Sequence, residues 1–370
     1  MNAFPKAGDI FPAKEAIELI PAADLGPPIE VPEIPAEARP ENVSGEEQEF
    51  WTSEILRLKK ERGAIILAHN YQIPGIQDVA DAVGDSLNLA ETGKKSGAKV
   101  LVECSVLFMN QILAVMKKPE QIVLAPSLNA LCSLAASVKL ENLLAWKQAH
   151  PTGKVVSYVN TYIDIKAESD YCCASANADK VIKYVFTKYP DSPILFLPDV
   201  HLGLYAAKML QKIGCDIDRL WLNMGACHVH DMIRLYHIHD ARKEHPEAIV
   251  AIHPECGCTS GCIAAIARGT MPENTIRIRS TQGMIKMLKE TPQKEIIVAT
   301  EIGNIYPMSK AAPEKTFIPA SYDAVCAFMK QNTLKNLYES LRDMKYEITV
   351  DPKLAARARI PIERMLSITD

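Results

Sequence analysis

Short apolar runs recur along the chain, and stretches with the apolar spacing of a helix lie between them. Three of these runs open the segments 64–72 (AIILAHNYQ), 154–162 (KVVSYVNTY) and 248–256 (AIVAIHPEC). Continuous apolar runs of this length predict buried strands. Residues 181–186 (VIKYVF) instead place apolar side chains at i, i+1, i+4 and i+5, on one face of a helix. The alternation of strands and helices predicts an α/β fold with small parallel sheets.

Each of these three predicted strands ends in a polar, reactive side chain. His69, Tyr158 and His253 occupy equivalent positions, and they are separated by 89 and 95 residues. Recurrence of one kind of segment at a nearly fixed spacing is typical of an internal repeat. The strands therefore predict that the chain is built from three related units.

Three further landmarks follow each of these strands in the same order. The first is a hydroxyl residue before a helical pattern, a predicted helix N-cap, at Ser86, Ser175, Ser280 and Thr281. The second is another apolar strand that ends in an acid, at Glu103, Asp199 and Glu301. The third is a loop with one cysteine that leads into a helix, at Cys132, Cys227 and Cys326. Together these landmarks predict three repeats of about 95 residues.

The predicted fold is three similar α/β/α sandwich domains with small parallel sheets, arranged around a pseudo-threefold axis. The domains are expected to span 46–150, 151–245 and 246–345, and a C-terminal helical segment is expected at 346–370. In parallel sheets of this kind, ligands bind at the carboxyl ends of the strands. The polar strand ends of the three domains would then converge on one active site at the centre.

Residues 1–45 differ in composition from the rest of the chain. Eight of the 24 prolines lie in the first 40 residues. Because proline fixes φ and removes a backbone donor, this N-terminal arm is expected to be extended or loosely ordered. The folded part is expected to begin near Glu46, with a helix through 51–63 (WTSEILRLKKERG).

Composition narrows the class of protein. Hydrophobic residues make up 48% of the 370 residues and charged residues 23%, as in an ordinary globular protein. A net charge of −4 argues against a nucleic-acid binder held by a general basic field. No apolar run approaches the roughly 18–20 residues of a transmembrane helix, and the first residues lack the features of a signal peptide. A cytoplasmic protein that binds neither nucleic acid nor membrane is expected.

The ten cysteines point to metal or thiol chemistry, because disulfides are rare in proteins of this compartment. Cys132, Cys227 and Cys326 occupy matched positions in the three repeats. Three thiolates from three domains would form a tripod that holds an iron–sulfur cluster and leaves one iron open to substrate. An open metal position is what a Lewis-acid site requires. The competing interpretation is that these are buried packing cysteines.

Two other groups of metal-binding residue types compete with this tripod. One is the run Cys256, Cys258 and Cys262, whose spacing fits no standard zinc finger. The other is the segment 227–240, with Cys227, His228, His230, His237 and His239. The sequence alone leaves both groups open, as zinc ligands or as ordinary structural side chains.

The strand ends also carry groups that could move protons or bind anions. His69 and Tyr71, Tyr158 and Asn160, and His253 and Glu255 form three pairs, each with a spacing of two. Because side chains alternate along an extended chain, each pair faces one side and could face the central cavity. Hydroxyls at predicted helix N-termini (Ser86, Ser175 and Thr281) would suit phosphate or carboxylate groups.

Long motifs carry a resemblance to a known family. They include LAHNYQIPGIQDVAD (67–81), GDSLNLA (84–90), SDYCCASANA (169–178), AIHPEC (251–256) and CAFMKQNTLKNLYESL (326–341). The chain resembles the quinolinate synthases, the iron–sulfur enzymes of NAD biosynthesis, from about Trp51 to Leu366. Only the proline-rich arm lies outside the resemblance.

The resemblance implies a reaction, a cofactor and a set of site residues. It implies condensation of iminoaspartate with dihydroxyacetone phosphate to quinolinate, phosphate and water, and a functional link to an enzyme that produces iminoaspartate. It implies one [4Fe–4S] cluster per chain on Cys132, Cys227 and Cys326, whereas Cys256, Cys258 and Cys262 are not assigned to it. The implied substrate positions are His69, Ser86, Tyr158, Asn160, Ser175, His230, His253, Glu255 and Thr281. The implied catalytic residues are His69, Tyr71, Tyr158 and Glu255.

Two alternatives belong to other classes of protein. One is a different tripod iron–sulfur enzyme, resembling the diphthamide-synthesis proteins that cleave S-adenosylmethionine. The other is a non-catalytic protein that binds zinc through its Cys/His segment. Binding of S-adenosylmethionine would indicate the first, and stoichiometric zinc without colour would indicate the second.

Overall fold

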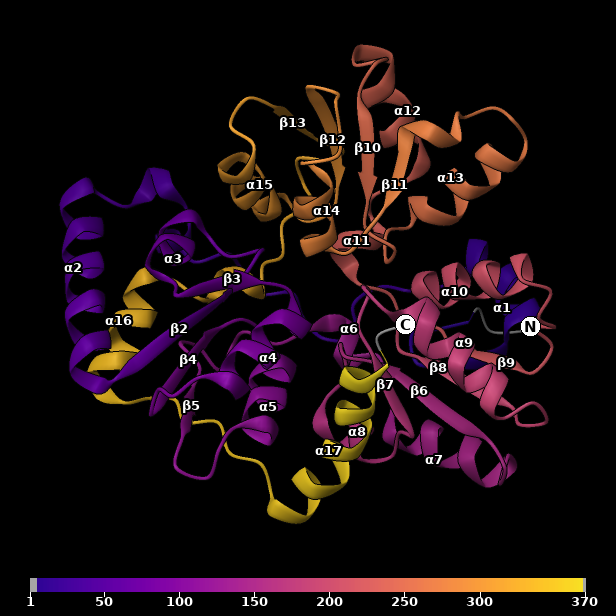
Figure 1. Ribbon diagram of the computed structural model, residues 1–370, viewed down its shortest axis with the longest axis horizontal. Helices are drawn as coiled ribbons and strands as arrows, with labels where there is room; N and C mark the ends of the chain where they lie inside the picture. The colour runs from indigo at the N-terminus through magenta and orange to yellow at the C-terminus, as the bar shows by residue number, and fades with distance from the viewer. Residues whose placement is uncertain (1–4, 369–370) are drawn as a thin grey trace.

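A computed structural model describes residues 5–368, and within that range the strands form three sheets (Figure 1). The first sheet has the order β3-β2-β4-β5: Ala82–Gly84, Ala64–His69, Val100–Cys104 and Ile122–Leu124. The second has the order β7-β6-β8-β9: Tyr171–Cys173, Lys154–Tyr158, Ile194–Leu197 and Leu220–Asn223. The third has the order β11-β10-β12-β13: Ile276–Ile278, Ile249–Ile252, Glu295–Ala299 and Thr316–Pro319. All pairs within these orders are parallel.

The helices follow the same order in each unit. In the first unit they are α2 (Gly45–Arg62), α3 (Pro74–Val79), α4 (Ser86–Lys95) and α5 (Leu107–Met116). In the second they are α7 (Leu140–Ala149), α8 (Ile163–Ala167), α9 (Ala178–Lys188) and α10 (Val200–Lys212). In the third they are α12 (Leu235–Glu244), α13 (Cys258–Ala267), α14 (Thr281–Met287) and α15 (Ile305–Ala311). One helix precedes each strand throughout, so the predicted α/β class with small parallel sheets is confirmed.

Short helices and turns lie outside these units. Figure 1 shows α6 (Ser133–Ala136) and α11 (His228–Asp231) where the units meet. Near the C-terminus, α16 (Leu334–Asp343) packs on α2, and α17 (Pro352–Ser367) packs on α8 and β7. Short 3₁₀ turns cover Ile20–Ala22, Ala36–Ala38, Pro40–Asn42, Glu273–Thr275, Ile302–Asn304 and Met329–Gln331. None of the helices within residues 5–368 is long and apolar enough to cross a membrane.

The proline-rich arm is more regular than its composition predicts. Residues Ile10–Pro12 form β1, which pairs antiparallel with β9 at the edge of the second sheet. Helix α1 (Ala13–Leu19) follows and packs on β9 and α10. The expectation of a loosely ordered arm is therefore wrong for these residues. An uncovered β9 would expose a row of unpaired backbone groups, and β1 satisfies them.

The first long helix begins close to the predicted position. Its N-terminus at Gly45 has a capping box, in which Ser44 and Glu47 satisfy each other's backbone N–H groups. It ends at Gly63, which adopts the left-handed conformation that terminates many helices.

Only one of the four hydroxyl residues predicted as N-caps has that role. Ser280 caps α14, and Thr281 is the first helical residue after it. Ser86 is likewise the first residue of α4, and the carboxylate of Asp85 caps that helix. Ser175 lies in the turn before α9, whose N-cap is Asn177. All four side chains lie within three residues of helix starts, and Ser86, Ser175 and Thr281 line the cavity described below.

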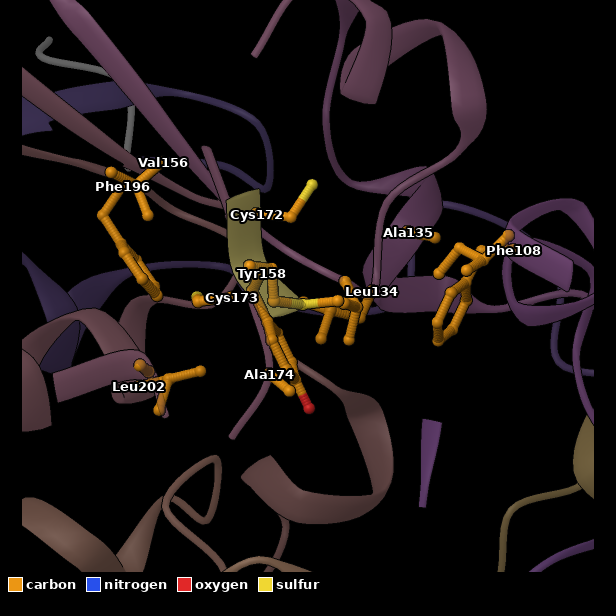
Figure 2. Close-up of a cluster of buried hydrophobic side chains, with 14 of the residues drawn as sticks. Phe108, Leu134, Ala135, Val156, Tyr158, Cys172, Cys173, Ala174, Phe196 and Leu202 are labelled. Atoms are coloured by element: carbon orange, nitrogen blue, oxygen red, sulfur yellow. The ribbon is translucent and has the colours of Figure 1, made fainter. Parts of the chain in front are cut away.

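One apolar core joins the first and second units. Phe108 and Leu134 from the first unit belong to the same cluster as Val156, Cys173 and Phe196 from the second unit (Figure 2). The ring of Tyr158 belongs to it as well, and the residue is 5% exposed. This shared core fixes the strand that carries Tyr158 against the loop that carries Cys132.

Candidate active site

A cavity lies where the three units meet, and residues of all three units line it. His69 is the last residue of β2, Tyr158 is the last residue of β6, and His253 directly follows β10. Every site residue predicted from the sequence lines this cavity: His69, Tyr71, Ser86, Cys132, Tyr158, Asn160, Ser175, Cys227, His230, His253, Glu255, Thr281 and Cys326. The predicted convergence of the carboxyl strand ends is confirmed, while the role of each residue stays a prediction.

The three repeat cysteines each line the cavity from a different turn. Cys132 and Cys227 are the residues that precede α6 and α11, and Cys326 precedes the 3₁₀ turn at 329–331. The three residues are partly exposed, and all line the cavity. Burial raises the pKa of the Cys132 thiol to about 12 and that of Cys326 to about 11. Burial also raises the pKa of Cys227 well above its ordinary value.

The surroundings of these sulfurs fit a metal cluster. The backbone N–H of Ala135 donates to the Sγ of Cys132 at 3.4 Å. Backbone groups near Cys227 and Cys326 likewise favour the thiolate, and the charge of Cys326 raises the pKa of both other cysteines. Three neighbouring thiolates would repel one another unless a cation lies between them. Thiolate donors with N–H groups aimed at sulfur are typical of iron–sulfur sites.

Glu255 lies at the centre of a group of aromatic side chains. Its carboxylate accepts a hydrogen bond from the hydroxyl of Tyr158. Its oxygens lie 3.4 Å from Nδ1 of His230 and 3.7 Å from Nδ1 of His253. The two imidazole rings stack with centroids 4.7 Å apart. Burial opposes the charge of Glu255, but the neighbouring imidazoles and the Tyr158 hydroxyl outweigh it and lower the pKa to about 2. Glu255 is therefore an ionised, buried carboxylate.

His69 presents a donor to the cavity. Its Nδ1 accepts from the backbone N–H of Tyr71 at 3.2 Å, so the ring proton of the neutral form is on Nε2. Burial lowers the pKa of His69 to about 3, and the ring is therefore neutral at neutral pH. The tautomer leaves an N–H that can donate to a bound carbonyl or phosphate oxygen.

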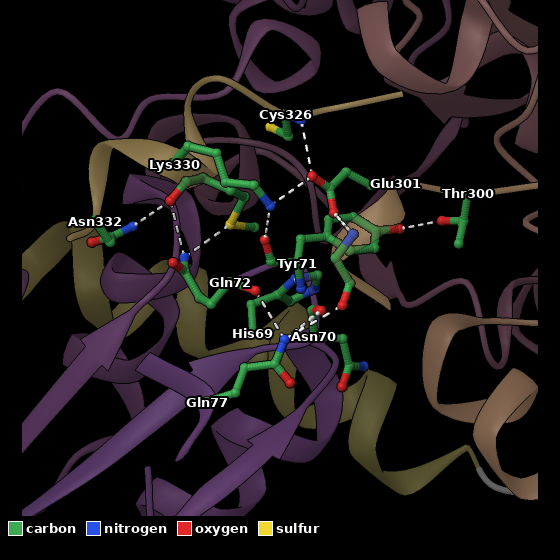
Figure 3. A network of polar contacts seen from close by, with 12 residues as sticks. His69, Asn70, Tyr71, Gln72, Gln77, Thr300, Glu301, Cys326, Lys330 and Asn332 are labelled. Carbon is green, nitrogen blue, oxygen red and sulfur yellow. Dashed lines mark hydrogen bonds and ion pairs between the residues drawn. The ribbon is translucent and has the colours of Figure 1, made fainter. Parts of the chain in front are cut away.

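Tyr71 is held at both ends by residues from the third unit (Figure 3). Its hydroxyl contacts Thr300 Oγ1 at 2.7 Å and His230 Nε2 at 3.1 Å. Its carbonyl oxygen accepts from the ammonium of Lys330, which also contacts Glu301 Oε1 at 2.7 Å. The sequence motifs singled out Glu301 as a strand-end acid, but they did not single out Thr300 or Lys330. The available sign of Lys330 in the sequence was its position at the end of the otherwise apolar run CAFMK (326–330).

Hydroxyl and amide groups line the part of the cavity that faces α4 and α14. Ser86, Ser175, Thr281 and Asn160 lie there, and Asn70 Nδ2 donates to Thr281 Oγ1 at 3.0 Å. Within residues 5–368, no lysine or arginine lines the cavity. An anionic ligand would thus be bound by hydroxyls, neutral imidazoles and backbone N–H groups.

The two competing cysteine and histidine groups lie mostly elsewhere. Cys256, Cys258 and Cys262 are fully buried in the core of the third unit and do not line the cavity. In the other group, Cys227, His228 and His230 line the cavity. His237 and His239 belong to α12 and are absent from the cavity lining. The segment 227–240 therefore does not form one metal site.

The buried imidazoles predict acid sensitivity of the fold. Burial lowers the pKa of His253, like that of His69, to about 3, whereas an unfolded histidine titrates near pH ~6.5. Below pH ~6.5 the unfolded chain gains protons that the folded chain does not. The stabilisation from keeping these histidines neutral is therefore complete above pH ~6.5, and it is lost as the pH falls towards 3. Each of the two histidines should lower the free energy of unfolding by about 2 kcal/mol between pH ~7 and ~5.

Urea unfolding of the chelator-treated chain at the two pH values checks this prediction. His253→Gln should show a shallower pH dependence than the unchanged chain. His239→Gln, on the exposed surface of α12, is the matched control and should keep the full dependence. Equal pH dependence in all three proteins would contradict the prediction.

Comparison with known proteins decides the family. Residues 53–367 match the family model described as Quinolinate synthetase A protein. The chain belongs to the quinolinate synthase family. It is 44% identical over 321 residues to a quinolinate synthase of Thermus thermophilus, an alignment that covers 86% of this chain and 98% of that protein.

Other quinolinate synthases match over a similar length. The chain is 44% identical over 313 residues to that of Pyrobaculum aerophilum, covering 84% of this chain and 97% of that protein. It is 39% identical over 326 residues to that of Mycobacterium tuberculosis, covering 88% and 90%. The resemblance inferred from the motifs is confirmed, and the chain is an enzyme of this family. The arm that forms β1 and α1 lies outside the matched residues.

Proposed function

We propose that the chain condenses iminoaspartate with dihydroxyacetone phosphate to quinolinate, with release of phosphate and water. The observation that carries this proposal is the meeting of three cysteines and the Glu255 group in one cavity of a quinolinate synthase fold. The catalytic, substrate and ligand roles below are proposals for residues whose positions are described above.

Cys132, Cys227 and Cys326 would hold one [4Fe–4S] cluster per chain. The fit rests on the donor set: three thiols that line one cavity, with backbone N–H groups near their sulfurs. When bound, such a cluster supplies an iron with an open position that acts as a Lewis acid on substrate oxygen. The chain's part is to hold three thiolates in a cavity that His230 and Glu255 share.

The hydroxyl groups that line the cavity would bind the phosphate and carboxylates of the substrates. Ser86 is the first residue of α4, so its hydroxyl lies at the positive end of the dipole of a helix of 10 residues. Ser175 and Thr281 face the same cavity from the other two units. The described lining contains no lysine or arginine, so phosphate would be bound weakly enough to dissociate after the reaction.

Proton transfers would use Glu255, Tyr158, His69 and Tyr71. Glu255 is ionised and buried, so it can accept a proton within the cavity. Burial raises the pKa of Tyr158 and of Tyr71 well above the ordinary value, so both hydroxyls stay protonated and donate. The Nε2–H of His69 provides a further neutral donor. Together these groups could deprotonate carbon or nitrogen and protonate leaving hydroxyl groups.

Iminoaspartate is an imine, and water hydrolyses imines readily. The proposed reaction therefore requires a nearby source of it, namely an enzyme that oxidises the corresponding amino acid. The proposal places both activities in the cytoplasm, as the sequence composition predicts.

A single metal ion is the second candidate for the site. Ligand atoms of Cys227, His230 and Glu255 lie within 4.8 Å of one another, which could accommodate a zinc ion. However, this candidate leaves Cys132 and Cys326, which line the same cavity, without a role. The three-cysteine cluster explains more of the cavity.

Quinolinate formation by the anaerobically purified chain tests the proposed function. Iminoaspartate generated in the assay together with dihydroxyacetone phosphate should give quinolinate and phosphate in equal amounts. Omission of either substrate should give neither product. Phosphate release without quinolinate, or no turnover by iron-loaded protein, would contradict the proposal.

A further inference from the structure

A buried ion pair links the Cys326 loop to Tyr71, and nothing in the proposed chemistry requires it to be charged. Lys330 Nζ contacts Glu301 Oε1 at 2.7 Å, and the two side chains are 9% and 0% exposed. Burying two charges costs free energy that an apolar pair of similar size would not cost. A pair kept at such a place can instead fix one arrangement of the groups around it.

The partners Cys326 and Tyr71 of this pair belong to segments that carry proposed functional residues. Glu301 Oε1 also accepts from the backbone N–H of Cys326 at 3.1 Å, and Glu301 Oε2 accepts from Gly303 N at 2.7 Å. Lys330 donates to the carbonyl oxygen of Tyr71 (Figure 3). A continuous path of hydrogen bonds therefore runs from the Cys326 amide through both charges to the Tyr71 peptide.

The neighbouring residues reinforce this path. A Cβ atom at Gly303 would lie 2.9 Å from the carbonyl atoms of Tyr71 and 2.7 Å from Glu301 Oε2, so only glycine allows this close approach. Thr300, the residue before Glu301, contacts the hydroxyl at the other end of Tyr71. The end of β12 thus holds Tyr71 at its peptide and at its phenol.

We infer that Lys330 and Glu301 are positioning residues that fix Tyr71 relative to the Cys326 loop, so that the proton donor and the metal-ligand loop are placed together. This inference rests on the proposed function of Tyr71 and Cys326. The pair acts through Tyr71, and it need not touch substrate. It also gives a role to the buried lysine that follows the apolar run 325–329.

Other contacts keep the same segments together when the pair is removed. Gln72 Nε2 donates to Met329 O at 3.1 Å, and Asn332 Nδ2 donates to Ser105 O at 3.0 Å. The double variant Glu301→Gln/Lys330→Met avoids an unpaired buried charge, and the amide oxygen can still accept from a backbone N–H. The variant should therefore fold and change the placement of Tyr71.

Hydrogen–deuterium exchange on the anaerobic protein tests this directly. In the double variant, amides in both 69–73 and 326–332 should exchange about 10-fold faster than in the unchanged chain. Lys310→Met is the matched control, because Lys310 pairs with Asp78 between the same two units but at an exposed site. In that control, the exchange rates of both segments should stay within about twofold of those in the unchanged chain. Faster exchange at 326–332 alone would overturn the inference.

Kinetics supply a second, independent measurement. The double variant should keep its iron and sulfide, lower kcat about 10-fold and leave KM within about threefold, because position and not binding is lost. In a Tyr71→Phe background the same double change should have no more than about a twofold further effect. If the double change lowered kcat as much in the Tyr71→Phe background as in the unchanged chain, the inference would be overturned.

Two points separate this inference from the proposed function. Glu301→Gln/Lys330→Gln, which also leaves no unpaired buried charge, is the second variant should the first double variant not fold, and it should shift exchange in the same two segments in the same direction. Exchange is measured without substrate. An unchanged chain that makes no quinolinate would contradict the proposed function, whereas the exchange pattern alone decides whether the pair positions Tyr71.

Discussion

Replacing Cys227 by alanine is expected to abolish quinolinate formation and to remove the iron–sulfur absorption of the anaerobic protein. Cys227 is one of three thiols in the cavity, and its sulfur lies within 4.8 Å of ligand atoms of His230 and Glu255. Loss of a thiolate would leave two protein ligands for a cluster that needs at least three. Because metal Lewis acids contribute several kcal/mol to catalysis, activity should fall at least about a thousandfold.

The matched control for this variant is Cys258→Ala. Cys258 is a fully buried thiol in the core of the third unit, outside the cavity lining. Its replacement should leave the absorption unchanged and activity within about twofold. A fully active Cys227→Ala, or equal cluster loss in both variants, would show that the three-cysteine assignment is wrong.

Replacing Glu255 by glutamine is expected to lower kcat by about 10²–10⁴-fold while the iron and sulfide content stays unchanged. The carboxylate is 2% exposed, accepts from Tyr158 and lies beside two imidazoles that favour its charge. Glutamine has nearly the same shape but cannot accept a proton at neutral pH. The loss should therefore appear mainly in kcat and less in KM.

Glu295→Gln provides the matched control in the same unit. Glu295 also faces a histidine, since its Oε1 lies 3.0 Å from Nδ1 of His245, but it is at the opposite end of β12 from the cavity. Its replacement should leave kcat within about twofold. If Glu255→Gln were as active as this control, Glu255 would not be the proton acceptor.

Much of the fold follows from local patterns in the sequence. The strands β2, β6 and β10 are mostly apolar segments of four to six residues, and each is followed by helical spacing. The short strands β3, β7 and β11 have three residues each and give no pattern of their own, because neighbouring strands define them. Strand β1 was missed for the same reason: its pairing with β9 is a contact between residues about 210 positions apart.

The candidate site could be predicted from the sequence because its motifs repeat along the chain. His69, Tyr158 and His253 stand out only because equivalent strands end at the same point of each repeat. The contributions of Thr300 and Lys330 could not be predicted in this way. Their partner is Tyr71, which lies 229 and 259 residues earlier, and only the packing of the third unit on the first brings them together.

The most direct test of the account is the iron and acid-labile sulfide content of the anaerobically purified chain. The account predicts about four of each per chain, with both lost when Cys132, Cys227 or Cys326 is replaced. Stoichiometric zinc, or no metal after anaerobic reconstitution with iron and sulfide, would contradict it: the chain would then have kept the fold of its family without the cluster.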